Sequence, residues 1–134
     1  NVMRALRLSY SEARQMFRRM VFNFVVRNQD DHTKNISFLM GEDGKWHLSP
    51  AYDMSYAYNP NGGWTATHQM SINEKFDNIT REDLLTFASK NNIKDAASVI
   101  DDVCEAASHW EGIAKDCGVP SSMIDAIIPN MILG

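Results

Sequence analysis

The feature that most constrains the fold is one helical segment that changes from amphipathic to apolar on every side. Ser9 and Glu12 have the S-x-x-E spacing of a capping box, which predicts a helix start. Apolar residues recur at helical spacing over residues 13–25, opposite a polar face. From Val21 to Val26 the segment is apolar almost all round. We therefore expect its second half to be deeply buried, so that whatever follows is anchored in the core.

A polar loop and a hairpin are predicted to follow this helix. Residues 27–35 are nine polar residues in succession. Residues 36–40 and 45–48 are rich in β-branched and aromatic side chains and flank the turn 41–44, a pattern typical of a β-hairpin. Residues 55–79 are rich in Asn, Gly and Tyr and predict a long loop.

The second half of the chain predicts helices. Thr80 and Asp83 form a second capping pair, and a further helix is expected over 95–117, ended by Gly118. A last short helix is expected over 121–128. The inward faces are predicted to comprise Leu84, Leu85, Phe87, Ala88, Ala96, Val99, Ile100, Val103, Ala107, Ile113 and Ala114. The expected fold is mainly α with a small β-hairpin, in one domain spanning residues 1–134.

Composition limits the cellular environment in which this chain is expected. No apolar run is long enough to span a bilayer, so no membrane association is expected. Cys104 and Cys117 are too far apart on the predicted helix for a disulfide, which favours free, mostly buried thiols and a cytoplasmic protein. The chain has no secretory leader and begins with Asn1, which suggests a piece of a longer protein.

Charge is distributed unevenly along the chain. Residues 1–40 carry +4 and residues 41–134 carry −8, within a net charge of −4. The acidic remainder argues against direct nucleic-acid binding. The early arginines are interpreted as a solvated helix face; they are Arg4, Arg7, Arg14, Arg18 and Arg19.

Three oxygen-bearing side chains near the hairpin suit phosphoryl transfer. Asp30 lies in the polar loop, Asn35 follows five residues later, and Asp53 comes just after the hairpin. A substrate hydroxyl needs a carboxylate to orient it and accept its proton, a role that fits Asp30. Mg²⁺ prefers oxygen ligands, which Asn35 and Asp53 supply. Lys34 is placed to offset charge on the migrating phosphoryl group.

The same residues resemble a known family. Asn28-x-Asp30-x-His32-x-Lys34-Asn35-x-Ser37 looks like the catalytic loop of HipA-type serine/threonine kinases, the toxin kinases of bacterial toxin–antitoxin pairs. Pro50-Ala51-Tyr52-Asp53-Met54 looks like the metal-binding segment of that family. The Asp-x-His-x-x-Asn spacing is also similar to the loop of phosphoinositide-type kinases. The likeness is close over residues 16–56 and looser, as a helical C-lobe, over 80–130.

This resemblance implies a kinase-like C-terminal lobe that acts with ATP and Mg²⁺. It makes Asp30 the catalytic base, assisted by Lys34, with Asn35 and Asp53 as the metal ligands and His32 and Lys34 near the nucleotide. In the better-known members the protein substrate is an aminoacyl-tRNA synthetase, a DNA-binding antitoxin restrains the kinase, and the activity is linked to persistence. No glycine-rich phosphate loop occurs in the sequence. We therefore expect the N-lobe to lie upstream, and the 134-residue chain alone to transfer no phosphate.

Several alternatives remain open at the level of sequence. Asp31 is adjacent to Asp30 and could take its role, while His32 also fits a hydrogen-bonding strut of the loop. Trp64 and His68 could belong to a substrate groove. The domain could instead be a non-catalytic regulatory or binding lobe. A third alternative is a metal-dependent hydrolase that uses Asp30, Asp31, His32 and Asp53.

Overall fold

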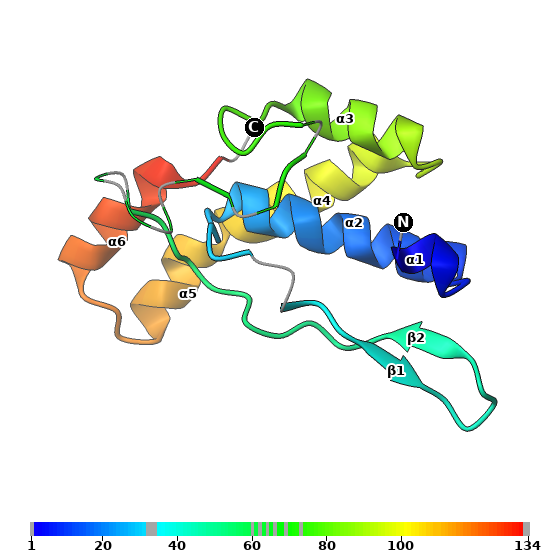
Figure 1. Ribbon diagram of the computed structural model, residues 1–134. Coiled ribbons are helices and arrows are strands. Elements are labelled where there is room, and N and C mark those ends of the chain that lie inside the picture. Colours follow the sequence, from blue (N-terminus) through cyan, green and yellow to red (C-terminus); the bar gives the residue numbers. More distant parts are fainter. Residues whose placement is uncertain are drawn as a thin grey trace.

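The computed structural model shows a helical body from which a small hairpin projects (Figure 1). It describes residues 2–31, 35–59, 61, 63, 65, 67, 68, 70–72 and 74–132. The predicted combination of helices and one hairpin is confirmed. The elements are α1 (Val2–Ala5), α2 (Tyr10–Val25), β1 (Phe38–Met40), β2 (Trp46–Leu48), α3 (Arg81–Lys90), α4 (Ala96–Ser108), α5 (Trp110–Asp116), α6 (Ser121–Ile127) and the 3-10 turn η2 (Ile128–Asn130).

Helix α2 begins at the predicted capping box. The Ser9 side chain accepts a hydrogen bond from the Glu12 amide at 3.2 Å, and the Glu12 carboxylate accepts one from the Ser9 amide. As predicted, the second half of the helix is buried, with Val21 and Val25 at 0% and 1% exposure. The polar segment that follows α2 therefore starts from a fixed point in the core.

The core lies where α2 packs on α4, with α3 alongside (Figure 1). Phe17 of α2 stacks on Phe87 of α3, with ring centroids 6.4 Å apart. Val99 and Ile100 of α4 close the core from the other side and are almost fully buried. Among the described residues, no helix has both the length and the apolar character needed to cross a membrane.

The helix predicted over 95–117 is two helices, because α4 ends at Ser108 and α5 begins at Trp110. The Ser108 hydroxyl donates to the carbonyl of Glu105 at 2.6 Å. In a continuous helix the His109 amide would donate to the Glu105 carbonyl. It donates to the Ala106 carbonyl, which makes a tighter turn. The prediction that Ile113 faces inward is wrong: α5 turns it outward and leaves it 57% exposed.

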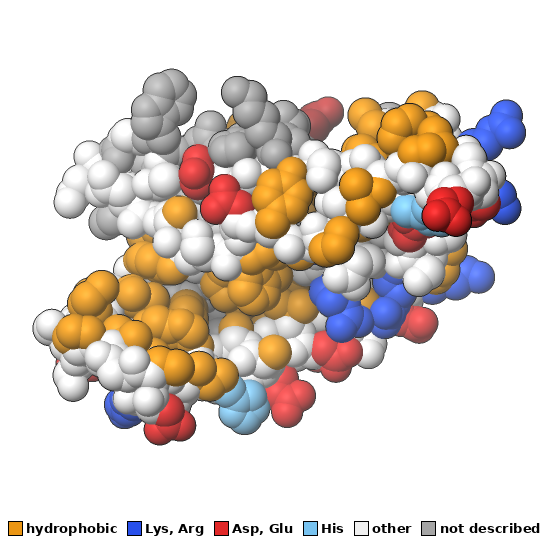
Figure 2. All heavy atoms as spheres, turned by 90° about the horizontal axis from the view of Figure 1, so that it is seen from below, with side chains coloured by type: hydrophobic (Ala, Val, Ile, Leu, Met, Phe, Trp, Pro, Cys, Tyr) orange, Lys and Arg blue, Asp and Glu red, His pale blue; other side chains and the backbone are white. Residues whose placement is uncertain are grey.

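Two predictions about surface groups need correction. Arg19 is not solvated but buried, at 9% exposure, and its Nη2 donates to the Ser49 carbonyl at 2.5 Å. The other four arginines are exposed or half-buried, and Figure 2 shows Lys and Arg side chains gathered on the face seen from below. Both cysteines are free as predicted, although Cys117 is exposed rather than buried.

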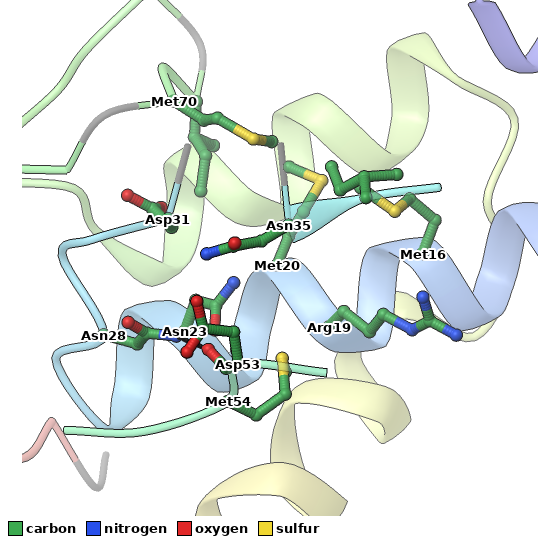
Figure 3. Close-up of a pocket in the computed structure, with 12 residues that line it drawn as sticks. Met16, Arg19, Met20, Asn23, Asn28, Asp31, Asn35, Asp53, Met54 and Met70 are labelled. Carbon is green, nitrogen blue, oxygen red and sulfur yellow. Dashed lines mark hydrogen bonds between the residues drawn. The ribbon is translucent and has the colours of Figure 1, made fainter. Parts of the chain in front are cut away.

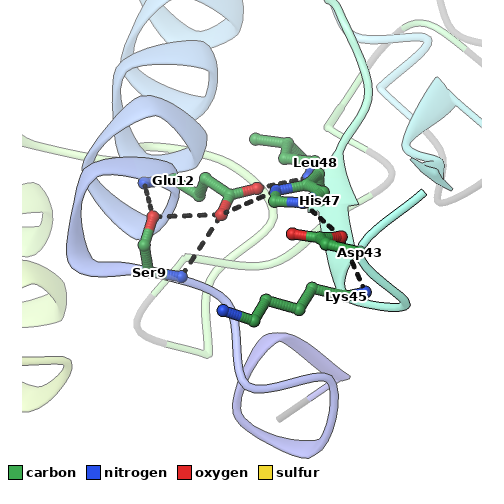
Figure 4. A network of polar contacts seen from close by, with 6 residues as sticks. All are labelled: Ser9, Glu12, Asp43, Lys45, His47 and Leu48. Atoms are coloured by element: carbon green, nitrogen blue, oxygen red, sulfur yellow. Dashed lines mark hydrogen bonds and ion pairs between the residues drawn. The ribbon is translucent and has the colours of Figure 1, made fainter. Parts of the chain in front are cut away.

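The hairpin is fastened to α2 through Glu12 (Figure 4). Strands β1 and β2 are antiparallel, with Leu39 opposite His47. Glu12 accepts a hydrogen bond from the Leu48 amide at 2.5 Å, and His47 Nδ1 lies 3.7 Å from the same carboxylate. These contacts fix the base of the hairpin, from which the chain returns toward the loop after α2.

We expect the replacement Glu12→Gln to cost about 1–2 kcal/mol at neutral pH, because it removes charge-assisted hydrogen bonds. The Leu48 amide is the main cause that lowers the pKa of Glu12 below its ordinary value of 4.5. A lowered carboxyl pKa contributes stability above the unfolded value, and this contribution is lost as the pH falls through the folded value. Urea unfolding between about pH 7 and pH 3 should therefore show the wild type and the variant converging in acid. A difference that stays constant with pH would contradict this, and exposed Glu105→Gln is the control.

Candidate functional site

The end of α2 and the segment after the hairpin are joined by backbone hydrogen bonds. Asn28 and Ala57 form a parallel bridge. The Gln29 amide donates to the Ala57 carbonyl at 2.9 Å, and the Ala57 amide donates to the Arg27 carbonyl at 3.0 Å. This bridge brings the predicted catalytic loop beside the predicted metal-binding segment, which is distant in sequence.

Asn28 adds a side-chain clamp to the bridge. Its Nδ2 donates to the Asp53 carbonyl at 3.1 Å and to Asn23 Oδ1 at 3.0 Å. Asn28 is 2% exposed, so these bonds form out of water. One buried amide therefore connects helix α2, the predicted catalytic loop and the backbone of Asp53.

A pocket opens beside this clamp (Figure 3). Asn35 and Asp31 approach it from one side, and Asn28 and Asp53 from the other. Its lining comprises Met16, Arg19, Met20, Asn23, Asn28, Asp31, Asn35, Ile36, Asp53, Met54, Met70 and Ile72. The pocket therefore combines oxygen-bearing side chains with an apolar wall of α2 and loop residues.

Asn35 is oriented by the loop that it closes. Its Nδ2 donates to the Asp30 carbonyl at 3.0 Å. This bond fixes the amide through its nitrogen and leaves the amide oxygen available as a ligand atom. The loop thus presents Asn35 as an oxygen donor at the pocket.

Asp53 adopts a backbone conformation that few residues accept. Its φ of +57° lies in the left-handed region, which costs energy for most residues but is tolerated by Asp and Asn. The clamp from Asn28 to its carbonyl holds this conformation. Its side chain is exposed at the mouth of the pocket.

The two neighbouring aspartates of the loop have different environments. Asp30 is exposed and is not among the residues that line the pocket. Asp31 is 7% exposed, lines the pocket and lies 2.9 Å from the Nδ1 of buried His68. The predictions for His32, Lys34 and Trp64 fall outside the described residues.

Some residues of the pocket were not anticipated from the sequence. Asn23 carried no signal in the sequence, whereas Asn28 was expected only as the first residue of the Asn28-x-Asp30 motif, with no role of its own. Met70 and Ile72 belong to the long loop. The available signal was Ile72, an isolated β-branched residue in a polar stretch. In the sequence, Arg19 is one of several arginines in the same segment. Its partner is a carbonyl thirty residues away, and no sequence pattern indicates that contact.

The donors at this pocket suit a hard divalent cation. The Asn35 amide oxygen and the Asp53 carboxylate are the ligand types that Mg²⁺ takes, and it commonly uses few protein ligands together with phosphate oxygens. Within the described residues, no three His, Cys, Asp or Glu side chains gather into a metal-binding group. Two oxygen donors match a cation that arrives with a phosphate-bearing ligand.

Comparison with known proteins agrees with the resemblance of the motifs. A protein from Sinorhizobium fredii named "Putative kinase Y4dM" is 28% identical over 124 residues, 89% of this chain and 30% of that protein. The chain thus spans less than a third of the length of this relative. No solved structure matches this chain. The family model of the HipA-like C-terminal domain matches residues 1–130, and the chain belongs to this family.

Proposed function

We propose that this chain is the C-terminal catalytic lobe of a HipA-like serine/threonine protein kinase that uses ATP and Mg²⁺. The observation that carries the proposal is the pocket shared by Asn35 and Asp53, which come from two separate segments of a chain in this family. The similarity to a protein named a kinase supports the same reaction class.

The proposed roles follow from the chemistry of phosphoryl transfer. Exposed Asp30 orients the substrate hydroxyl and accepts its proton, while Asn35 and Asp53 hold the cation. When bound, Mg²⁺ neutralises charge on the phosphates. His32 and Lys34 are assigned to the nucleotide phosphates by the family motif alone. Asp30 is preferred to Asp31 as the base because its side chain is exposed, whereas Asp31 is buried against His68.

The remaining parts of the reaction are proposed to lie outside this chain. A kinase needs a loop over the phosphates and a lysine from an N-lobe, and the relative is more than three times as long as the matched region. We propose a protein substrate, with an aminoacyl-tRNA synthetase as the candidate that the family suggests. A DNA-binding antitoxin is the corresponding candidate regulator, in the cytoplasm.

Phosphoryl transfer by the full-length protein tests this function. With γ-labelled ATP and Mg²⁺, we expect label on serine or threonine of the protein itself or of an added protein, and we expect none from the isolated 134-residue chain. Metal titration separates the kinase from a hydrolase, because a kinase site should bind Mn²⁺ weakly until ATP is added. Tight metal binding without nucleotide, or no labelled protein under any condition, would overturn the proposal.

A further inference from the structure

His68, a residue of the long loop, contacts the predicted catalytic loop through Asp31. The His68 side chain is 3% exposed and its Nδ1 lies 2.9 Å from Asp31 Oδ2, on a carboxylate that is itself 8% exposed. A carboxylate oxygen accepts hydrogen bonds, so the geometry is that of an Nδ1–H donor on His68 and an Oδ2 acceptor on Asp31. A charge-assisted bond between two buried groups is among the stronger contacts a loop can make.

His68 is itself fixed from several directions. Its ring packs on Phe24 of α2, with centroids 6.2 Å apart, and its amide donates to the Phe76 carbonyl at 3.0 Å. Two nearby residues of the same long loop, Met70 and Ile72, line the pocket, and Ile72 is 4% exposed. His68 therefore connects the core, through Phe24, with Asp31 of the predicted catalytic loop.

The contact with Asp31 bears on the reacting groups through the backbone. Asp31 follows Asp30 directly, and the Asp30 carbonyl accepts the bond that orients Asn35. A shift of this peptide would move the proposed base and one proposed metal ligand together. Misplacement by about 1 Å can cost about 10²-fold in rate, so a fixed Asp31 has kinetic value.

We propose that His68 is a positioning residue for the kinase reaction: its hydrogen bond to Asp31 fixes the loop that carries Asp30 and Asn35. This inference rests on the proposed function and adds a residue outside the catalytic motif. His68 touches neither substrate nor nucleotide in this account. Its effect should therefore appear in kcat rather than in the KM for ATP.

The test compares two replacements in the full-length protein. His68→Leu removes the donor but keeps apolar bulk, and it should lower kcat about 10–100-fold with little change in the KM for ATP. His68→Asn places an amide nitrogen near the position of Nδ1 and should restore kcat to within about threefold of wild type. The exposed His109→Leu is the matched control and should leave kcat unchanged.

A double-mutant cycle separates positioning from packing. In an Asp31→Ala background, His68→Leu should have almost no further effect, because the bond is already gone. Equal losses in the Leu and Asn variants, additive effects with Asp31→Ala, or wild-type kcat in His68→Leu would each overturn the inference. A wild-type protein without phosphoryl transfer would instead refute the proposed function. The Nδ1–H resonance of His68, which should shift in Asp31→Asn, tests the bond without any assay of activity.

Discussion

Asp53→Asn in the full-length protein is expected to lower the rate of phosphoryl transfer by about 10²–10³-fold at ATP and Mg²⁺ concentrations that just saturate the wild type. The replacement removes the charge that is proposed to hold the cation, while preserving the size of the side chain. It also preserves the backbone, because Asn accepts the left-handed conformation seen at φ +57° as readily as Asp. Single-turnover measurement of label transfer gives the chemical step directly.

The control for this variant is Asp125→Asn, the same chemical change at an exposed position of α6. It should keep wild-type activity. Raising the Mg²⁺ concentration should recover part of the lost rate in Asp53→Asn, since the defect lies in metal binding. If Asp53→Asn kept activity within about threefold of wild type, Asp53 would not be a metal ligand.

Phe17→Ala is expected to destabilise the domain by about 3–5 kcal/mol, a large share of the 5–15 kcal/mol typical of folded domains. Phe17 is 1% exposed and stacks on Phe87, so its removal leaves a cavity between α2 and α3. Because the predicted catalytic loop starts from the end of α2, unfolding of the domain should also disrupt the candidate site. The midpoint of urea unfolding measures the effect.

Ile113→Ala serves as the control for the core variant. It removes a large apolar side chain that is 57% exposed, and the expected change is within about 0.5 kcal/mol. Comparable unfolding midpoints for Phe17→Ala and Ile113→Ala would mean that Phe17 does not contribute to the core formed by α2, α3 and α4.

Local sequence signals predicted the elements well because their causes are local. The capping boxes at Ser9 and Thr80 each start a helix at the expected residue, and the apolar stripe of α2 is buried as its spacing indicates. The break between α4 and α5 was missed because it rests on local hydrogen bonds, among them the bond from the Ser108 hydroxyl to the Glu105 carbonyl. Such competition for one carbonyl has no periodic signature.

Long-range contacts were harder to anticipate for a physical reason. Asn35 and Asp53 could be placed near one another because the hairpin between them returns the chain to its starting point. The burial of Arg19 against the Ser49 carbonyl and the pairing of Asp31 with His68 depend on tertiary packing across thirty or more residues. Sequence patterns register which residues are polar, but they do not register which distant atom satisfies them.

A crystal structure of the full-length protein with Mn²⁺ and a non-hydrolysable ATP analogue tests the central claim most directly. The anomalous signal of manganese locates the cation independently of the protein. We expect it about 2.0–2.3 Å from both Asn35 Oδ1 and an Asp53 carboxylate oxygen, with the remaining ligands from phosphate and water. A cation bound elsewhere, or these two side chains more than about 10 Å apart around the bound nucleotide, would contradict the account.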